Sequence, residues 1–263
     1  MSSIERLAVT TASYLMSKRI AFRLAKFMLA TQGVGWAGPG GGIRSSGEIS
    51  FLKNSLEDLS KACVFDVGSN IGDYAFEVLN IKPDAYLHCF EPSLDHCKVL
   101  MPRFPQSKNV LINQFGLSNN NSKQTLYKDK KISGLASLVQ RNLKHINVFL
   151  NKSEEVKTVI GDQYIKNQKI KRIDYLKIDV EGWEMNVLIG LKESFSKKII
   201  KVCQFEFGHA QIERRLNFRD FYLFFKEINY KIGIIKPNGK INLIPNYDEF
   251  YENYYASNFV AFL

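Results

Sequence analysis

The stretch Val64–Ala75, VFDVGSNIGDYA, decides the fold of this chain. An apolar run around Asp66 predicts a short buried strand that ends at Val67, and an amphipathic pattern that resumes at about Gly72 predicts a helix. Gly68 and Gly72 permit a tight turn between them, because glycine adopts positive φ without strain and lets the backbone approach a ligand. This strand, turn and helix predict a parallel α/β sheet with a ligand beyond the carboxyl end of the strand.

The turn has the pattern D-x-G-x-N-x-G, from Asp66 through Asn70 to Gly72. A dinucleotide-binding turn reads G-x-G-x-x-G and places a pyrophosphate on the helix N-terminus. Here Asp66 stands at the first position, and a carboxylate pointing at the turn repels a pyrophosphate but suits an ammonium or a hydroxyl donor. The pattern therefore favours S-adenosylmethionine over NAD, with Asp66, Gly68, Asn70 and Gly72 as cofactor-binding residues.

The next predicted strand, AYLHCFEP, ends with an acid, Glu91, which falls 19 residues after Gly72. An acid at this distance, closing the adjacent strand, is where a ribose diol is held, with both hydroxyls donating to one carboxylate. The alternative role for Glu91 is to cap the helix that begins near Ser93. The joint occurrence of the glycine turn and the delayed acid favours a nucleoside site.

Outward from this motif, short apolar runs alternate with amphipathic segments from about residue 49 to the end of the chain. Alternating βα units of this kind specify a mostly parallel sheet with helices on both faces. We expect the last strand, NFVAFL, to run antiparallel at or near an edge. Ser118, after the strand NVLINQFGL, is expected to border the adenine of the cofactor.

The first 47 residues read differently from the α/β region, so we predict an N-terminal helical extension with a glycine-rich loop at 1–47 and the main domain at 48–263. Residues 3–30 mix apolar and basic side chains with helical spacing. We expect these helices to pack onto the main domain, and contact with an anionic membrane is the alternative. The loop Gly33–Glu48 lacks the GK[ST] of a phosphate-binding loop and is predicted to be a flap or a connector.

The composition bounds the partners and the compartment. The chain has 263 residues, 45% of them hydrophobic, and a formal net charge of +10, which suits anionic partners but does not choose among them. No stretch approaches the ~20 apolar residues that span a bilayer, and no signal-peptide pattern is present. Four cysteines without a CxxC pair indicate buried free thiols. We therefore expect a cytoplasmic protein, with membrane association confined to peripheral contact through residues 3–30.

Four segments occur in a characteristic order: VFDVGSNIGDYA, FEPS, GLASL and IDYLKIDVEGWEMNVLIG. In this order and spacing they resemble the FkbM family of S-adenosylmethionine-dependent methyltransferases, over roughly residues 47 to 210. The resemblance implies the Rossmann-like class I methyltransferase fold, with seven strands. It also implies O-methylation of a hydroxyl on a sugar or glycan, such as a polysaccharide or glycolipid, or on a natural product. Ser133 and Ser137 match a family segment near the active site.

A second acidic cluster marks another edge of the site. Asp179 ends one predicted strand, and Glu206 should end the neighbouring one, about 4.8 Å away. Close carboxylates need a shared proton or a cation between them, and Mg²⁺ would meet that need and bind sugar hydroxyls. Metal-free catalysis, with Glu181 capping a helix, is the alternative.

A sugar hydroxyl is a poor nucleophile near neutral pH, so its methylation needs a base. His209, three residues beyond Glu206, is the best single candidate because imidazole is neutral and available near pH 7. Asp179 is the competing base. A structural role for this single histidine is the alternative.

Other classes of protein are disfavoured. Amino-methylating enzymes of nucleic acid carry a [DN]PP[YF] loop and cytosine-5 enzymes a Pro-Cys nucleophile, and neither occurs here. No basic stripe interleaved with aromatics is present, so no nucleic acid partner is expected. A non-catalytic S-adenosylmethionine-binding module stays open, although pure binding does not require the second acidic cluster. The acceptor pocket should be shaped by residues 31–47, 118–150 and the C-terminal hairpin.

Overall fold

The deciding motif folds as a strand, a turn and a helix. In the computed structural model, which describes residues 2–36, 42–105 and 107–263, strand β1 spans Cys63–Val67 and helix α5 spans Asp73–Ile81. Gly72 is the N-cap of α5, at φ 90°, where an L side chain would be strained. A Cβ at Gly72 would also lie 2.5 Å from Leu100 Cδ1. The positive φ therefore favours glycine at this position, and the Leu100 side chain packs closely over it.

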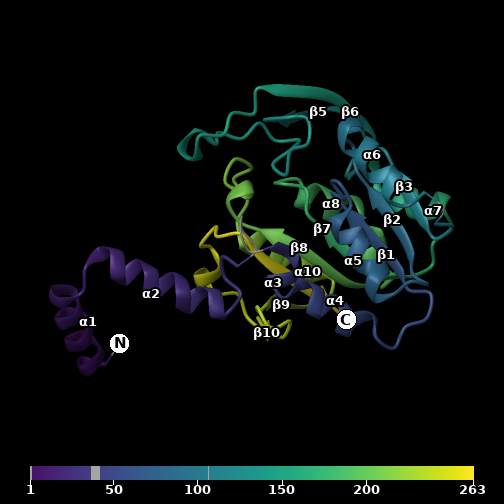
Figure 1. Cartoon of the computed structure of the whole chain (residues 1–263). Coiled ribbons are helices and arrows are strands. Elements are labelled where there is room, and N and C mark those ends of the chain that lie inside the picture. The colour runs from purple at the N-terminus through teal and green to yellow at the C-terminus, as the bar shows by residue number, and fades with distance from the viewer. Residues whose placement is uncertain (1, 37–41, 106) are drawn as a thin grey trace.

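An eight-stranded sheet forms the centre of the molecule, in the order β10-β9-β11-β8-β7-β1-β2-β3 (Figure 1). The chain runs outward from β1 to β3 and then returns to β7 on the other side of β1. Strand order therefore reverses at the boundary between the neighbouring strands β1 and β7. Ligands in such sheets usually bind beyond the carboxyl ends of the strands at this point. Besides β1, the strands are β2 Tyr86–Phe90, β3 Val110–Asn113, β7 Ile173–Ile178, β8 Ile200–Phe207, β9 Lys231–Ile235, β10 Ile241–Leu243 and β11 Ser257–Phe262.

Strands β3, β2, β1, β7 and β8 are parallel to one another, and β11 runs antiparallel to both β8 and β9. With β9, these make the seven strands of the predicted class I methyltransferase fold. Strand β10 is an eighth, added antiparallel to β9 through the Pro237–Gly239 turn. The predicted antiparallel direction of the last strand is confirmed. It lies inside the sheet, because Ser257–Ala261 are all buried, and β10 takes the edge.

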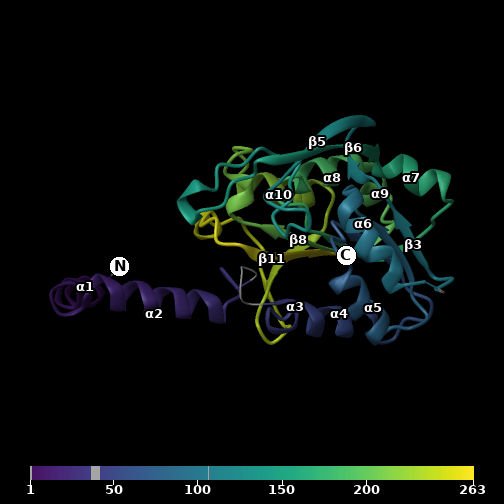
Figure 2. The same ribbon diagram turned by 45° about the horizontal axis from the view of Figure 1, so that its top comes forward.

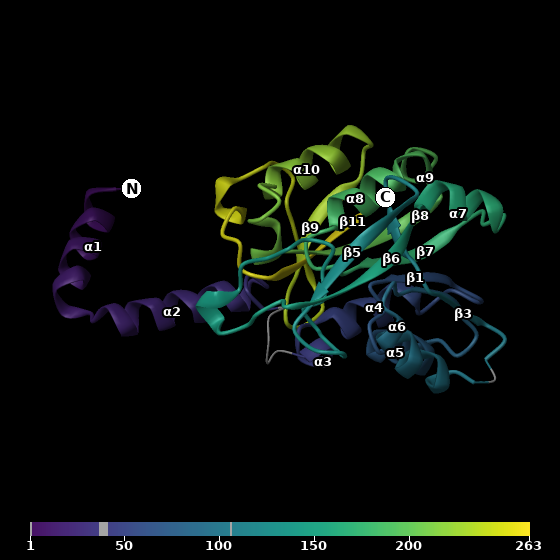
Figure 3. The same cartoon turned by 90° about the horizontal axis from the view of Figure 1, so that it is seen from above.

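Helices cover both faces of the sheet, as predicted, and Figure 3 shows the two layers. In one layer, Leu52 of α4 shares a buried cluster with Val64 and Tyr175 of the sheet. In the other, Phe221 and Phe225 of α10 share a buried cluster with Phe205 of the sheet. The first layer comprises α4 Glu48–Leu56, α5 and α6 Leu94–Leu100, and the second comprises α7 Gly161–Asn167, α8 Glu184–Gly190, α9 Lys192–Ser196 and α10 Phe218–Glu227. Short 3₁₀ turns are Met101–Arg103, Lys144–Ile146, His209–Gln211 and Glu249–Tyr251.

A second, three-stranded sheet was not predicted. It has the order β4-β6-β5, with β4 at Gly116–Ser118, β5 at Ser122–Lys128 and β6 at Lys152–Ile160. The single strand expected at NVLINQFGL is instead divided between the two sheets. Strand β3 ends at Asn113, whose side-chain amide donates to the Cys89 carbonyl at 3.0 Å, and the second sheet begins at Gly116.

The N-terminal helices differ from the prediction. Helices α1 Ser3–Leu15 and α2 Lys18–Thr31 bury no residue and project away from the sheet (Figures 1 and 2). The chain rejoins the domain at Val34, which is buried in the core, and at Gly35, whose N–H donates to Ser257 Oγ at 2.9 Å. The short helix α3 spans Gly42–Ser45, and the part of the glycine-rich loop at 37–41 lies outside the described residues. The domain boundary at residue 47 stays a prediction.

Candidate active site

A cavity of about 550 Å³ lies beyond the carboxyl ends of the central parallel strands. Its volume is within the range of small-molecule sites. One end is lined by the β1 turn and the end of β2, including Gly68, Asn70 and Glu91. The other end is lined by the ends of β7 and β8, including Asp179, Glu206 and His209. Both predicted clusters therefore meet in one cavity.

The backbone N–H groups in the turn after β1 are not free to bind a phosphate. The N–H groups of Gly68 and Ser69 both donate to the Phe90 carbonyl, at 2.9 and 3.1 Å, and the Asn70 N–H donates to Glu91 Oε2 at 2.8 Å. Phosphate sites at helix N-termini depend on free backbone donors, and here these donors are used within the protein. Because these N–H groups are already hydrogen-bonded, the geometry supports the prediction that the turn does not favour the pyrophosphate of a dinucleotide.

Asp66 does not take the position expected of it. Its side chain is fully buried on the face covered by α4 and α5, outside the lining of the cavity, although Gly68 and Asn70 line it. Neither carboxyl oxygen has a hydrogen-bond partner among the described residues, since the Ser69 hydroxyl donates to the Asp66 carbonyl instead. Burial raises the pKa of Asp66 to about 6, although the nearby ammonium of Lys177 opposes this. The Asp66 side chain therefore lies behind the turn and outside the cavity lining.

Gly68 is required by the protein itself. A Cβ at this position would lie 1.8 Å from the backbone oxygen of Asp179. The glycine thus brings the β1 turn and the end of β7 into contact. This contact joins the two halves of the cavity wall.

Glu91 is nearly buried, at 5% exposed, and lines the cavity. Its Oε2 accepts the Asn70 N–H, and its Oε1 accepts the Ser93 N–H at 2.8 Å. The carboxylate therefore fixes the start of the α6 segment, the alternative role considered for it, and also faces the cavity. Oε1 also lies 3.3 Å from His96 Nδ1. Because a carboxylate offers about four lone-pair positions, Oε2 retains capacity for a ligand hydroxyl.

Besides Asp66, two further residues of the predicted cofactor set lie outside the lining. Gly72 packs against α6, as described above. Ser118 is fully buried, and its Oγ accepts the Trp183 indole N–H at 3.1 Å. Its neighbours Gly116 and Leu117 line the cavity, as does Trp183. Ser118 is therefore placed to support the cavity wall behind these residues.

Asp179 and Glu206 lie side by side, as predicted. Ile178 of β7 pairs with Phe205 of β8, so the next residues leave neighbouring strands together. Asp179 Oδ2 accepts from Lys177 Nζ at 2.9 Å. Burial and the negative charges of Asp179 and Glu181 raise the pKa of Glu206 well above its usual value. A proton on Glu206 and the ammonium of Lys177 thus relieve the repulsion between the two acids.

The residues present do not fit the predicted Mg²⁺ well. The cation beside Asp179 is Lys177, which is buried within the protein. Among residues 2–36, 42–105 and 107–263, no group of three or more His, Cys, Asp or Glu side chains is placed to hold a metal ion. Mg²⁺ prefers octahedral oxygen coordination, and two carboxylates supply only part of that set.

His209 follows β8 and lines the same end of the cavity. Burial lowers its pKa, and the nearby charges of Arg141 and His145 lower it further. The imidazole is therefore neutral near pH 7 and available to accept a proton.

Two further residues, Arg141 and Glu184, support this end of the cavity and were not selected from the sequence. Arg141 donates to Glu181 Oε2 at 2.7 Å and to the Leu135 carbonyl at 2.8 Å. Glu184, not Glu181, supports the backbone here, since its carboxylate accepts from the N–H groups of Val180 and Gly182. The acid-glycine spacing of DVEGWE was the available signal for Glu184, whereas nothing in the sequence links Arg141 to Glu181 across 40 positions.

The charge of the cavity is opposite to that of the chain. Its described lining contains five acidic side chains and no Lys or Arg side chain. The five are Glu48, Glu91, Asp179, Glu181 and Glu206. Such a wall favours a cationic or uncharged ligand over an anion.

The predicted pocket segments contribute unequally. Gly42 and Ile43 line the cavity, as do Leu126 and the segment Ser133–Leu138 apart from Ser137. Ser137 supports this wall from behind, its Oγ donating to the Glu181 carbonyl at 2.7 Å. From the C-terminal region, Ala256 and Asn258 of the last strand take part rather than the hairpin.

A profile of the methyltransferase FkbM domain matches residues 66–232, more than half of the chain. The chain belongs to the FkbM methyltransferase family. The predicted FkbM resemblance is thereby confirmed, and the matched residues include the β1 turn, Glu91 and the acidic cluster at Asp179.

Two curated proteins are similar to this FkbM chain. The hexuronic acid methyltransferase AglP of Haloferax volcanii is 27% identical over 164 residues, which cover 62% of this chain and 64% of AglP. The 2-O-methyltransferase NoeI of Sinorhizobium fredii is 23% identical over 152 residues, which cover 54% of this chain and 63% of NoeI. The chain thus spans somewhat less than two thirds of the length of either relative.

Solved structures are more distant. A precorrin-6y C5,15-methyltransferase from Geobacter metallireducens has a TM-score of 0.45 at 8% identity, covering 83% of this chain and 89% of that one. The FkbM assignment rests on the sequence match and on the strand order described above.

Proposed function

We propose that this protein transfers a methyl group from S-adenosylmethionine to a hydroxyl group of a sugar or glycan. The observation that carries the proposal is the single cavity with a nucleoside-type carboxylate, Glu91, at one end and Asp179, Glu206 and His209 at the other. Methyl transfer requires the donor and the acceptor to be held in line within one site, and a single cavity with these two ends meets that requirement.

The nucleoside end suits S-adenosylmethionine. When bound, this cofactor supplies an electrophilic methyl group on a sulfonium cation. Glu91 Oε2 is able to accept a ribose hydroxyl, and Gly68 and Asn70 form the wall beside it. The acidic lining suits a cation that carries an ammonium group. The backbone N–H groups of the β1 turn are already hydrogen-bonded within the protein and so are not free to bind a pyrophosphate.

The other end suits proton removal from the acceptor. His209, whose pKa is lowered by burial and Arg141, is placed to take the hydroxyl proton as the hydroxyl oxygen attacks the methyl carbon. Glu206, with a raised pKa, is placed to share a proton with the acceptor or with Asp179. Asp179, held by Lys177, is placed to orient an acceptor hydroxyl by accepting its hydrogen bond.

The acceptor class rests on the relatives and on charge. The names of AglP and NoeI describe a hexuronic acid methyltransferase and a 2-O-methyltransferase, and these names support a sugar hydroxyl or a related natural-product hydroxyl as the acceptor. The absence of Lys and Arg from the described lining disfavours a nucleic acid, whose phosphates require cations. The acidic end of the cavity disfavours a module that only binds the cofactor.

One experiment separates these classes. The full chain is incubated with methyl-labelled S-adenosylmethionine and separate fractions of glycan, lipid and nucleic acid, and binding of S-adenosylhomocysteine is measured by calorimetry. We expect binding, with label in the glycan or glycolipid fraction. Label in nucleic acid alone, or binding without transfer to any fraction, would favour the alternatives. Absence of binding contradicts the proposal as a whole.

We also propose that α1 and α2 rest on an anionic membrane surface. Within residues 3–31 there are five basic side chains and one acidic one. On α2, the apolar side chains of Ile20, Leu24, Phe27 and Met28 are between 50% and 66% exposed. Exposed apolar side chains combined with basic ones are typical of interfacial helices. Within the described residues, no helix is both long and apolar enough to cross a membrane.

The path from α2 to the cavity makes this contact relevant to the acceptor. Val34 is anchored in the core, and Gly35 is bonded to Ser257, whose neighbour Ala256 lines the acceptor end. A surface-bound α2 would therefore lie near the end of the cavity that receives a glycolipid.

Vesicle sedimentation tests this contact. We expect the full chain to sediment with phosphatidylglycerol-containing vesicles and less with phosphatidylcholine alone, and a Leu24→Ser, Phe27→Ser double variant to lose the binding. The exposed Ile146→Ser change on another surface is the control. A dimer in sedimentation velocity, without vesicle binding, would instead assign the apolar face to a second copy of the chain.

A further inference from the structure

We propose that His96 is a positioning residue that couples the carboxylate of Glu91 to the segment Ser133–Leu138, which covers the nucleoside end of the cavity. The sequence pattern offered no role for this histidine. The inference rests on the proposed function in one respect, namely that Glu91 holds the ribose.

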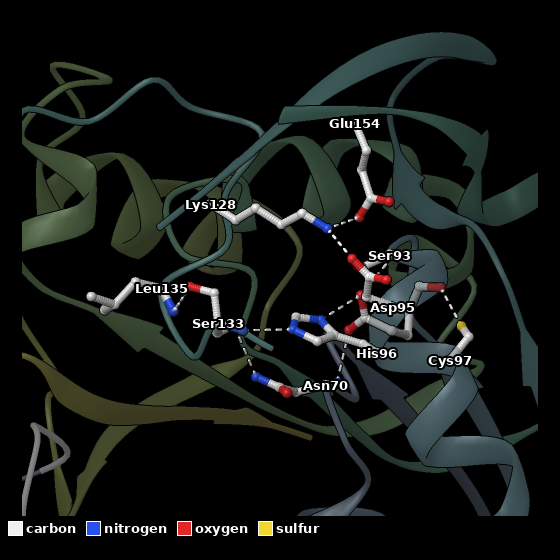
Figure 4. A network of polar contacts seen from close by, with 10 residues as sticks. Asn70, Ser93, Asp95, His96, Cys97, Lys128, Ser133, Leu135 and Glu154 are labelled. Carbon is white, nitrogen blue, oxygen red and sulfur yellow. Dashed lines mark hydrogen bonds and ion pairs between the residues drawn. The ribbon is translucent and has the colours of Figure 1, made fainter. Parts of the chain in front are cut away.

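The imidazole of His96 lies between the two parts that it joins. It is 1% exposed and lines the cavity from α6 (Figure 4). Its Nδ1 is 3.3 Å from Glu91 Oε1, and its Nε2 accepts the backbone N–H of Ser133 at 3.0 Å. One ring therefore contacts both the proposed ribose carboxylate and the covering segment.

These two contacts define the proton position on the ring. A backbone N–H can only donate, so Nε2 must carry a lone pair and accept. The ring hydrogen then resides on Nδ1, where it donates to Glu91 Oε1. A second proton, on Nε2, would place two N–H groups against each other and break the bond to Ser133.

The covering segment is organised around Ser133. The Ser133 hydroxyl donates to Asp129 Oδ1 at 2.5 Å and accepts the Leu135 N–H at 3.1 Å. The Asn70 amide lies 3.5 Å from the Ser133 carbonyl, and the Asn70 backbone N–H donates to Glu91. Ser133 is thus linked to Glu91 twice, through His96 and through Asn70. Movement of this segment is coupled by these links to the orientation of the Glu91 carboxylate.

A second anchor holds the same region without involving Glu91. Lys128 is 4% exposed, and its Nζ donates to Asp95 Oδ2 at 2.8 Å and to Glu154 Oε1 at 3.0 Å (Figure 4). Asp95 and His96 are successive residues of α6, and each holds the chain that leads from β5. Lys128 therefore serves as a matched control: it attaches the covering region to α6 but has no direct contact with Glu91.

The coupling is reciprocal. If occupancy of Glu91 stabilises the bond between His96 and Ser133, then the same bond increases affinity for the nucleoside by an equal factor. We expect S-adenosylhomocysteine to slow hydrogen exchange at Ser133–Ala136 in the wild-type protein. Loss of hydrogen bonds to a charged carboxylate costs about tenfold in affinity or more.

The test combines calorimetry with hydrogen exchange on the full chain. We expect His96→Phe to weaken S-adenosylhomocysteine binding about tenfold or more and to abolish the ligand-dependent protection of Ser133–Ala136. His96→Gln, whose amide both donates and accepts, should restore part of each effect. Lys128→Met should loosen the segment in the free protein but keep the affinity within about twofold of wild type.

Two results would overturn the proposal. The first is wild-type affinity and protection in His96→Phe, and the second is equal losses in His96→Phe and Lys128→Met, which would indicate a purely structural role. The imidazole ¹⁵N spectrum of the wild-type protein is a measurement that needs no variant. Nδ1 of His96 should carry the proton, and protonation of Nε2 alone contradicts the coupling. Absence of S-adenosylhomocysteine binding in the wild type would instead contradict the proposed function.

Discussion

The Asn70 backbone N–H donates to Glu91 Oε2 at 2.8 Å, which joins the turn after β1 to the end of β2. This bond sets the carboxylate of Glu91 at the cavity wall, beside the strand-order reversal between β1 and β7. A carboxylate held in place before a ligand arrives loses little conformational freedom on binding, so its hydrogen bonds contribute most of their strength to affinity.

We therefore expect Glu91→Gln to weaken S-adenosylmethionine binding by tenfold or more, because a charged acceptor is replaced by an amide and each such bond contributes about 1.5–3 kcal/mol. Glu91→Ala should weaken it further. Isothermal titration calorimetry with S-adenosylhomocysteine measures the effect. Glu155→Gln, an exposed acid on β6, is the control and should bind as the wild type does. Unchanged affinity in both Glu91 variants would remove this residue from the cofactor site.

The pH dependence of the rate identifies the base. A base must be unprotonated to act, so activity falls as the pH falls through its pKa. Because the pKa of His209 is lowered, the wild-type acid limb should lie below pH 6.5 if His209 is the base. His209→Gln should then remove this limb and lower kcat by about 10² to 10⁴.

Glu206 provides the competing outcome in the same measurement. Its pKa is raised well above its usual value, so a base at this position would give an acid limb that disappears in Glu206→Gln and persists in His209→Gln. A wild-type rate that shows no acid limb anywhere in the pH range where the protein stays folded would contradict both assignments.

The acidic cavity wall predicts discrimination against acidic acceptors. A carboxylate on the reacting sugar would meet several lining acids and no lining Lys or Arg among the described residues. We expect kcat/KM for a neutral p-nitrophenyl hexoside to exceed that for the matched hexuronide by at least about tenfold, because one repulsive pair in a partly buried site costs about 1–2 kcal/mol. Labelled methyl transfer to the two compounds measures the ratio.

Asp179→Asn should reduce this discrimination, because Asp179 is the ionised acid of this end of the lining, whereas Glu155→Gln should leave it unchanged. A preference for the hexuronide in the wild type would make this chain resemble AglP, as the name of that relative describes it, and would show that the acids do not face the reacting sugar.

The parts of the fold that could be predicted depend on local patterns. Buried parallel strands are short apolar runs, and the helices between them are amphipathic, so the main sheet and both helical layers followed from periodicity. Glu91 and Asp179 followed because parallel strands end at the same edge of the sheet, which brings their last residues together.

The parts that could not be predicted depend on contacts between distant segments. The ion pair of Arg141 with Glu181 joins a loop to the end of β7, and the bond of His96 to Ser133 joins α6 to another loop. No sequence pattern predicts either contact. Strand β11 was expected at or near an edge because it follows a hairpin region, whereas it is buried and lies between β9 and β8.

Asp66 gives a stability prediction because its carboxylate is buried without a hydrogen-bond partner among the described residues. Its pKa is about 6 in the folded protein, against 3.8 for an aspartate in an unfolded chain, so the folded state binds the proton more tightly. Stability from this group is therefore present below pH 3.8, is lost as the pH rises towards 6, and stays lost above it. We expect Asp66→Asn to stabilise the protein at pH 7.5 by about 1–3 kcal/mol, with the difference disappearing near pH 4. Urea unfolding at the two pH values measures it, with the exposed Asp58→Asn as the control, and a less stable Asp66→Asn at pH 7.5 would indicate that the ionised carboxylate is held by the Lys177 ammonium.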